Sequence, residues 1–165
     1  MIAPTDPRTP RVVLVGPPGA GKSTIGRKLA KELGVDLYDT DAGIERETGR
    51  TIPEIFAEDG EPAFRALERL EVAALSGPVV ADLGGGAFCQ PANAERLLAV
   101  GRVVFLDVSE AEAARRIGGG EGRPLASTWA PLLARRRPLY GRAHLRVEVD
   151  GLGPEAVARR ILGML

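Results

Sequence analysis

The chain has 165 residues, which fits one domain and is long enough to bury a substantial core. Basic and acidic residues balance at 22 each, so the formal net charge is zero and nucleic-acid binding is not expected. The single cysteine, Cys89, excludes an intrachain disulfide and a multi-cysteine metal site. Because the sequence shows no apolar signal segment and no run of 18 apolar residues, we expect a cytoplasmic protein without membrane contact. A single domain of this size can be self-sufficient, so we also expect a monomer.

The chain opens with a proline-rich stretch, followed by alternating strands and helices. Residues 1–10 are predicted to form a loose tail and 11–165 a single domain. The run RVVLV at 11–15 is typical of a strand buried on both faces, and a helix over 22–33 follows. Further strands are expected at 35–41, 77–86, 101–108 and 145–150. Further helices are expected at 42–58 (interrupted near GRTIP), 60–75, 91–100, 109–117, 129–138 and 153–165. This alternation predicts an α/β fold, a parallel sheet wrapped by helices.

The segment GPPGAGKST at 16–24 matches the pattern G-x-x-x-x-G-K-[ST]. Its curled backbone directs N–H groups at phosphate oxygens, and the helix that follows adds its positive end. In this pattern Lys22 reaches the β- and γ-phosphates, and Ser23 offers a hydroxyl to Mg²⁺. The alternative is a chance glycine turn, which the preceding strand and following helix disfavour. The loop alone does not separate a kinase from a GTPase or a motor.

The DTD segment at 39–41 follows the second strand. If these residues stay extended, Asp39 and Asp41 project to one side, so that one carboxylate can face the metal and the other substrate hydroxyls. The alternative for Asp41 is the N-cap of the helix that follows it.

Three further stretches fall near the expected ends of strands or on the neighbouring helices. In GEPAFR, Glu61 and Arg65 can pair on one helix face while Phe64 packs inward; the alternative is a surface ion pair. The glycines 84–86 allow close backbone approach to a ligand, or form a plain turn. Arginines at Arg123 and in RRRPLY at 135–140 can grip a carboxylate with two parallel bonds, or lie solvated at a helix end.

Taken in order, these motifs resemble the shikimate kinase family over residues 11–165. The matching pieces are GPPGAGKS, DTD, IPEIF, GEPAFR, LGGGA, RRIGGG, RP and RRPLY. The resemblance implies a P-loop NTP-hydrolase-type three-layer α/β/α fold with a five-stranded parallel sheet, as in nucleoside monophosphate kinases. It also implies an ATP-dependent kinase that phosphorylates the 3-hydroxyl of shikimate in aromatic amino-acid biosynthesis.

The resemblance further implies a role for each site residue. Catalysis would rest on Lys22, Asp41 and Arg123. ATP would be held by Gly19, Ala20, Gly21, Lys22, Ser23, Thr24, Arg116 and Arg123. Arg116 would lie over the adenine, and Arg123 would arrive on a lid at about 118–128. Shikimate would be held by Asp41, Arg65, Gly84, Gly85, Gly86 and Arg136, with the two arginines on its carboxylate. Mg²⁺ would be bound by Ser23, with Asp39 available through water. Asp82 departs from the family's pattern, because members often have a small hydroxyl or apolar residue there; its carboxylate could hold Mg²⁺ through water, as a Walker B acid would.

Two alternatives to this function remain at this point. Another small-molecule P-loop kinase, such as a gluconate-type or nucleoside-type enzyme, would share the phosphate loop. A nucleotide-binding regulator without transfer activity would share it too. Asp82 is also open to a second interpretation, as a strand-end carboxylate bonded to a backbone amide.

Overall fold

The structure, a computed structural model, describes residues 10, 12–117 and 126–165. These residues contain a five-stranded sheet in the order β2-β3-β1-β4-β5, in which every paired strand is parallel. The strands are β1 Val12–Val15, β2 Asp36–Asp39, β3 Val79–Asp82, β4 Val103–Asp107 and β5 Leu145–Glu148. The predicted fold class is therefore confirmed.

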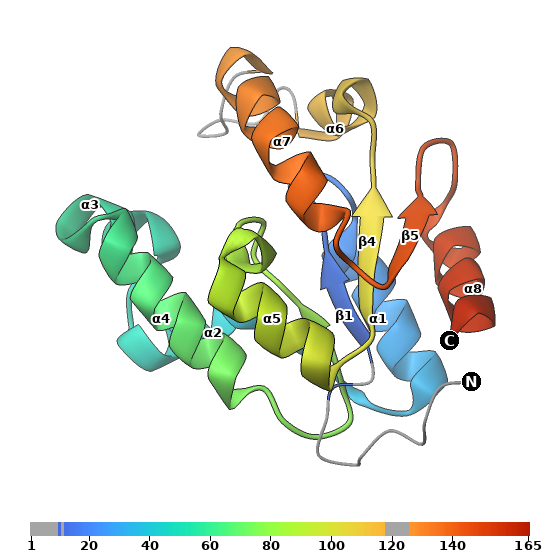
Figure 1. The fold of residues 1–165 in the computed structure, drawn as a ribbon, viewed down its shortest axis with the longest axis horizontal. Helices are drawn as coiled ribbons and strands as arrows, with labels where there is room; N and C mark the ends of the chain where they lie inside the picture. The colour runs from blue at the N-terminus through green and yellow to red at the C-terminus, as the bar shows by residue number, and fades with distance from the viewer. Residues whose placement is uncertain (1–9, 11, 118–125) are drawn as a thin grey trace.

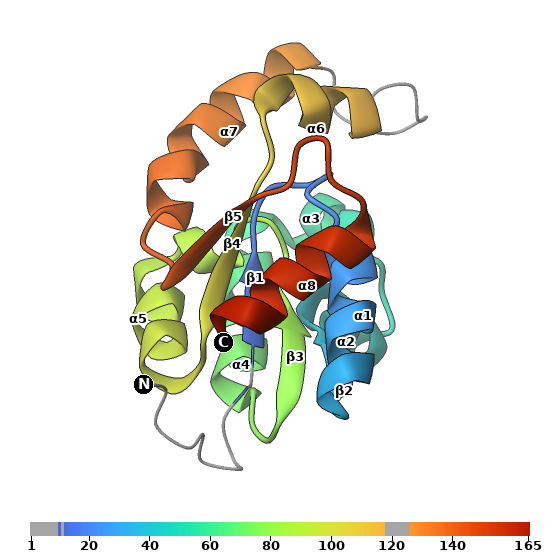
Figure 2. The same cartoon turned by 90° about the vertical axis from the view of Figure 1, so that its right-hand side faces the viewer.

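Helices cover both faces of this sheet. They are α1 Lys22–Leu33, α2 Thr40–Thr48, α3 Ile52–Asp59, α4 Glu61–Ala74, the 3₁₀ turn η1 Ala87–Cys89, α5 Pro91–Val100, α6 Glu110–Ile117, α7 Ala126–Tyr140 and α8 Pro154–Met164. Figure 1 shows α1 and α8 on one side of the sheet and α4 and α5 on the other. Figure 2 shows α8 and α1 side by side, with α8 toward the viewer. Within the described ranges, no helix is long and apolar enough to cross a membrane.

Local sequence signals account for several helix boundaries. The predicted break near GRTIP lies between α2 and α3: Gly49 ends α2 in the left-handed conformation, and Thr51 caps α3 in a capping box with Glu54. The helix predicted over 60–75 is α4, with Pro62 in its first turn. These boundaries follow from capping chemistry alone.

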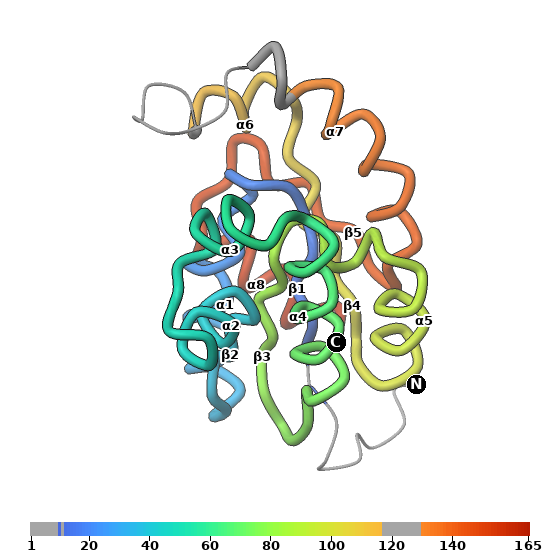
Figure 3. Tube along the Cα trace, turned by 90° about the vertical axis from the view of Figure 1, so that its left-hand side faces the viewer, coloured from blue at the N-terminus to red at the C-terminus, as the bar shows by residue number. Residues whose placement is uncertain are grey.

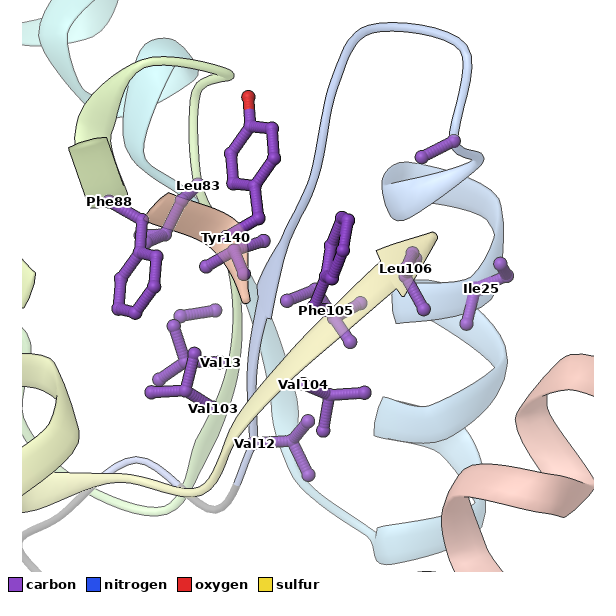
Figure 4. Close-up of a cluster of buried hydrophobic side chains, with 14 of the residues drawn as sticks. Val12, Val13, Ile25, Leu83, Phe88, Val103, Val104, Phe105, Leu106 and Tyr140 are labelled. Atoms are coloured by element: carbon purple, nitrogen blue, oxygen red, sulfur yellow. The ribbon is translucent and has the colours of Figure 1, made fainter. Parts of the chain in front are cut away.

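The core is built from the strands of the sheet centre. β1 and β4 are buried along their whole lengths, as expected for parallel strands covered on both faces. Figure 4 shows Leu106 of β4 pointing toward α1, while Val103 points toward the opposite layer, where Phe88 lies. The ring of Tyr140 stacks on Phe105 at a centroid distance of 5.2 Å. Tyr140, the last residue of α7, is thus part of this core.

One predicted helix end is wrong. The sequence predicts that the helix in this region stops at Pro138, but α7 runs to Tyr140 with Pro131 and Pro138 inside it. A proline removes one helix hydrogen bond and crowds the preceding turn, so a helix continues past it only where other contacts hold the last turn.

Two predicted segments fall partly outside the described residues. The tail lies outside them except for Pro10, which is buried. Residues 118–125 of the predicted lid, including Arg123, also lie outside, and 126–128 belong to α7.

The sheet determines where a site can form. Because the strands are parallel, their carboxyl ends meet at one edge, which is where ligands bind in open α/β sheets. Figure 1 and Figure 3 show α6 and α7 over this edge. The glycine loop after β1, the DTD segment at the end of β2 and the glycines after β3 all belong to it.

Candidate active site

The loop after β1 is shaped to hold an anion. Gly19 and Gly21 have φ angles of 84° and 90°, which only glycine adopts readily, and Gly21 begins α1. No described side chain caps the first turn of α1, so its N–H groups face the loop without a side-chain acceptor. The Nζ atom of Lys22 donates to the carbonyls of Gly16 at 2.8 Å and Pro17 at 3.1 Å, which holds the loop closed.

The ammonium group of Lys22 lies in a mixed environment. Burial lowers its pKa, and the nearby carboxylates of Asp82 and Asp41 oppose that shift. A cation held away from solvent and close to the loop is suited to neutralise phosphate charge.

A cavity of about 670 Å³ lies over this loop. Its volume falls in the range of small-molecule sites. It is lined by Pro18, Gly19, Ala20, Gly21, Lys22, Ser23, Thr24, Ile25, Asp82, Arg116, Val149, Leu152, Pro154 and Val157. One end is therefore rich in backbone N–H groups and cations, and the other is apolar. Arg116 closes over the loop, since its guanidinium donates to the carbonyl of Gly19 at 3.0 Å.

Asp82 ends β3 beside the phosphate loop. It is buried, and its Oδ2 accepts a hydrogen bond from the hydroxyl of Ser23 at 2.8 Å. Its partner is thus a side-chain hydroxyl, and the alternative of a backbone amide is wrong. Burial raises the pKa of Asp82, while the Ser23 bond and Lys22 lower it. A hydroxyl and a carboxylate, both hard oxygen donors, meet here.

The DTD segment does not stay extended, which corrects the sequence-based expectation. β2 ends at Asp39, and α2 begins at Thr40. Asp39 is the N-cap and accepts from the N–H of Ala42 at 3.1 Å, so the alternative of an Asp41 N-cap is also wrong. Asp41 lies in the first turn of α2 instead.

Asp41 is half-buried, and its environment disfavours a charge. Its Oδ1 has no hydrogen-bond partner among the described residues. Burial raises the pKa of Asp41 to about 6, helped by the charges of Asp39, Glu68 and Asp82 and opposed by Lys22. A carboxylate with a free oxygen and a pKa near neutrality is suited to accept a proton.

The three glycines after β3 bring the remaining predicted residues together. A methyl group at Gly84 would lie 2.6 Å from Oδ1 of Asp41. A methyl group at Gly86 would lie 2.6 Å and 2.7 Å from the terminal nitrogens of Arg65 and 2.9 Å from one of Arg136. One carboxylate and two guanidiniums therefore lie against the same short loop. Only a residue without a side chain allows this approach.

Arg65 is held by two carboxylates on its own helix. Its guanidinium pairs with Glu68 at 2.8 Å and with Glu61 at 3.4 Å, so the predicted Glu61 pair is present. It also lies over the ring of Phe64, which packs inward as predicted. Glu68 is fully buried, and its Oε2 has no partner among the described residues. The sequence-based interpretation gave no role to Glu68, although its spacing of three residues from Arg65 on a helix was visible.

Comparisons with known proteins agree with this arrangement. A family model described as shikimate kinase matches residues 18–165. The chain belongs to the shikimate kinase family. It is 48% identical to the shikimate kinase of Rhodococcus erythropolis, over 94% of this chain and 97% of that relative. It is also 48% identical to the shikimate kinase of Mycobacterium tuberculosis, over 94% of this chain and 93% of the relative.

Solved structures show the same fold. Shikimate kinase from Acinetobacter baumannii in complex with shikimate superposes with a TM-score of 0.88 at 38% identity, covering 94% of this chain and 92% of that one. The shikimate kinase of Aquifex aeolicus gives a TM-score of 0.81 at 31% identity, covering 93% and 94%. Members of this family are ATP-dependent kinases with an alcohol acceptor, and this chain is one of them.

The residues predicted for this shikimate kinase fall into two groups. Those predicted for ATP, from Gly19 to Thr24 together with Arg116, line the cavity over the phosphate loop. Those predicted for shikimate gather at the glycines after β3. Arg123 lies outside the described residues. The sequence also gave no separate role to Tyr140, whose hydroxyl donates to the carbonyl of Gly85 and so fixes the middle of the glycine loop.

Proposed function

We propose that this chain transfers the γ-phosphoryl group of ATP to the 3-hydroxyl of shikimate, a step of aromatic amino-acid biosynthesis. The observation that carries the proposal is the convergence of Arg65 and Arg136 on Gly86, next to Asp41 at Gly84. Shikimate is a hydroxylated ring with one carboxylate. Two guanidiniums suit the carboxylate, and an acceptor-only carboxylate suits the hydroxyls.

The nucleotide would occupy the cavity over the phosphate loop. Its phosphates would meet the N–H groups at the start of α1 and the ammonium of Lys22. The apolar wall formed by Val149, Leu152 and Pro154 would receive the base, with the Arg116 guanidinium on the same cavity. In this arrangement the γ-phosphate would lie toward Asp82 and Lys22, on the side of the residues proposed to bind shikimate.

The residues present fit Mg²⁺ as the cofactor. The hydroxyl of Ser23 lies 2.8 Å from the buried carboxylate of Asp82, and Asp39 is paired in register with Asp82 at the end of the neighbouring strand. Mg²⁺ prefers such oxygen donors and keeps several waters and substrate phosphates as its other ligands. Ser23 would hold the ion directly, with Asp82 and Asp39 acting through water. When bound, the ion would offset negative charge on the β- and γ-phosphate oxygens.

Catalysis would depend on alignment and charge neutralisation. Asp41, ionised above its raised pKa of about 6, would orient the acceptor hydroxyl and take its proton during transfer. Lys22 would stabilise the negative charge of the transferring group. Arg123, on the proposed lid at 118–128, would add a second cation there, and closure of the lid would exclude water as a competing acceptor.

The two arginines proposed to bind the shikimate carboxylate are already oriented toward the same glycine. Glu68 holds Arg65 at 2.8 Å, so the guanidinium is fixed with its remaining N–H groups toward Gly86. Arg136 reaches the same glycine from α7. The acceptor carboxylate would therefore meet two oriented guanidiniums at little further cost in side-chain entropy.

A coupled ADP-release assay tests this function. We expect ADP release that depends on shikimate, and little release with quinate, gluconate or nucleoside monophosphates. Preferred turnover of gluconate would instead support the gluconate-type alternative. Nucleotide binding without release on any acceptor would support a regulator.

Affinity measurements test the residue assignments separately. Arg136→Ala is expected to weaken shikimate binding far more than ATP binding in titration calorimetry. Equal losses of affinity for both ligands would contradict the proposal that Arg65 and Arg136 bind the shikimate carboxylate.

We further propose that the enzyme acts in the cytoplasm as a monomer, without a nucleic-acid or membrane partner. Analytical ultracentrifugation tests the oligomeric state.

A further inference from the structure

The last turn of α7 carries Arg136, yet its backbone is poorly suited to hold that residue in place. Pro138 lies inside the helix and has no N–H to donate to the carbonyl four residues earlier. The backbone bond from Gly141 N–H to the carbonyl of Arg137 at 3.1 Å continues the helix, and side chains attach this turn to the rest of the molecule. Arg137 and Tyr140 make the relevant contacts.

Arg137 ties this turn to the central sheet. Asp107, the last residue of β4, is buried, and its Oδ1 accepts from the guanidinium of Arg137. Its Oδ2 accepts from Nε of Arg146 in β5 at 2.6 Å. The backbone of Asp107 is itself fixed, because its carbonyl accepts from the N–H of Val149 at 3.0 Å. The partner of Arg137 is therefore a rigid point of the sheet.

Tyr140 ties the same turn to the glycine loop. Its hydroxyl donates to the carbonyl of Gly85, and its ring stacks on Phe105, two residues before Asp107. Figure 1 shows the end of α7 beside β4. Arg136 is therefore followed directly by two attachments of the same turn, one to the strand through Arg137 and one to the glycine loop through Tyr140.

Neighbouring side chains on a helix point about 100° apart, so Arg136 and Arg137 cannot serve the same ligand from one position. Arg136 approaches Gly86, and Arg137 turns to Asp107. The sequence RRR offers three adjacent arginines for the acceptor. The structure gives the second and third of them different partners.

We propose that the Asp107–Arg137 ion pair positions Arg136 and thereby sets the affinity for the acceptor carboxylate. Arg137 is a positioning residue, since it reaches Asp107 and acts through its neighbour. This inference rests on the proposed function, in which that carboxylate is the ligand of Arg136. Loss of the pair leaves Tyr140 as the remaining side-chain attachment described for this turn, so Arg136 samples other orientations and binds the acceptor less tightly.

The test compares single-site variants of the full chain. Arg137→Gln removes the ion pair but leaves Asp107 paired with Arg146, so the buried carboxylate keeps a partner and the protein is expected to fold. Arg137→Lys keeps a cation for Asp107. Arg135→Gln is the matched control, because it removes one charge from an exposed position of the same helix. Arg146→Gln removes the partner of Asp107 on β5 and leaves α7 attached.

We expect Arg137→Gln to raise the shikimate KM and Kd about tenfold, the effect of weakening one charge-assisted contact. The ATP KM should stay within about twofold, because none of the described residues that line the nucleotide cavity belongs to α7. Arg137→Lys should recover most of the shikimate affinity, while Arg135→Gln and Arg146→Gln should bind shikimate like the unmodified protein.

Different outcomes separate this inference from the proposed function. If the unmodified protein phosphorylates shikimate and Arg137→Gln has an unchanged shikimate KM, the positioning role is rejected and the function stands. The same holds if Arg137→Gln lowers only the melting temperature, or raises the KM for both substrates equally. If the unmodified protein neither binds nor phosphorylates shikimate, both proposals fail.

Discussion

Gly86→Ala is a steric probe of the acceptor site that leaves the backbone nearly untouched. Gly86 has φ −101° and ψ −6°, a conformation that alanine adopts without strain. Its added methyl group would lie 2.6 Å and 2.7 Å from the terminal nitrogens of Arg65 and 2.9 Å from Arg136. Because non-bonded atoms prefer about 3.5 Å or more, both guanidiniums must retreat by roughly 1 Å.

The displacement of the two guanidiniums should affect the free energy of unfolding and the shikimate affinity differently. The displaced atoms are the ends of flexible side chains, so the free energy of unfolding should change by less than about 1 kcal/mol. Shikimate, in contrast, would lose good geometry with at least one guanidinium. A hydrogen bond to a charged group is worth about 1.5–3 kcal/mol, and every 1.4 kcal/mol or so is tenfold in affinity. We expect the shikimate Kd to rise roughly 10- to 100-fold, with the ATP Kd within about twofold.

Titration calorimetry with each ligand, together with thermal unfolding, measures these quantities. Gly163→Ala is the matched control, because the added methyl group at this position of α8 meets nothing within 4 Å. It should bind both ligands like the unmodified protein. If Gly86→Ala binds shikimate normally, the guanidiniums at this loop do not hold the acceptor.

Three further variants test other parts of the molecule. Lys22→Ala should lower kcat at least about a thousandfold, because it removes the cation at the phosphate loop; a near-normal kcat would contradict that role. The pKa of Asp41 is raised to about 6, so kcat/KM should rise with pH through that value. Asp41→Asn should lose this rise of kcat/KM with pH, together with most of kcat. The raised pKa also means that ionisation of Asp41 destabilises the fold. Asp41→Asn should therefore be more stable than the unmodified protein at pH 8, by up to about 3 kcal/mol, and equally stable below about pH 4 in thermal unfolding. Arg96 donates to the carbonyls of Val72, Ala73 and Leu75 at the end of α4, so Arg96→Ala should lose about 1 kcal/mol in urea unfolding, with the shikimate KM unchanged.

The sequence predicts the parallel strands of the sheet and the phosphate loop well, because each depends on local patterns. A short apolar strand, a glycine loop and an amphipathic helix are all visible within about twenty residues. The DTD segment was harder to interpret. Asp39 and Asp41 are equally good N-caps by residue type. The choice depends on where β2 ends, and its ladder with β3 pairs Asp39 with Asp82, so the helix starts directly after it.

Long-range contacts account for the other differences. Pro138 is a local signal for a helix end, but the contacts of Arg137 with Asp107 and of Tyr140 with Gly85 hold the turn beyond it. Neither partner is near α7 in the sequence. Glu68 is similar: its spacing from Arg65 was visible, but its complete burial depends on how α4 packs in the folded chain.

The proposed acceptor site contains carboxylates whose burial costs stability. Asp41 and Glu68 each bury a carboxylate oxygen that has no partner among the described residues, and burial raises the pKa of both. A sequence selected for stability alone would replace such groups with apolar ones or pair them fully. Here the helices α2 and α4 and the glycine loop hold them close to Arg65 and Arg136. The site is therefore preorganised, with its hydrogen-bonding groups fixed by the fold before a polyol acid arrives to use them.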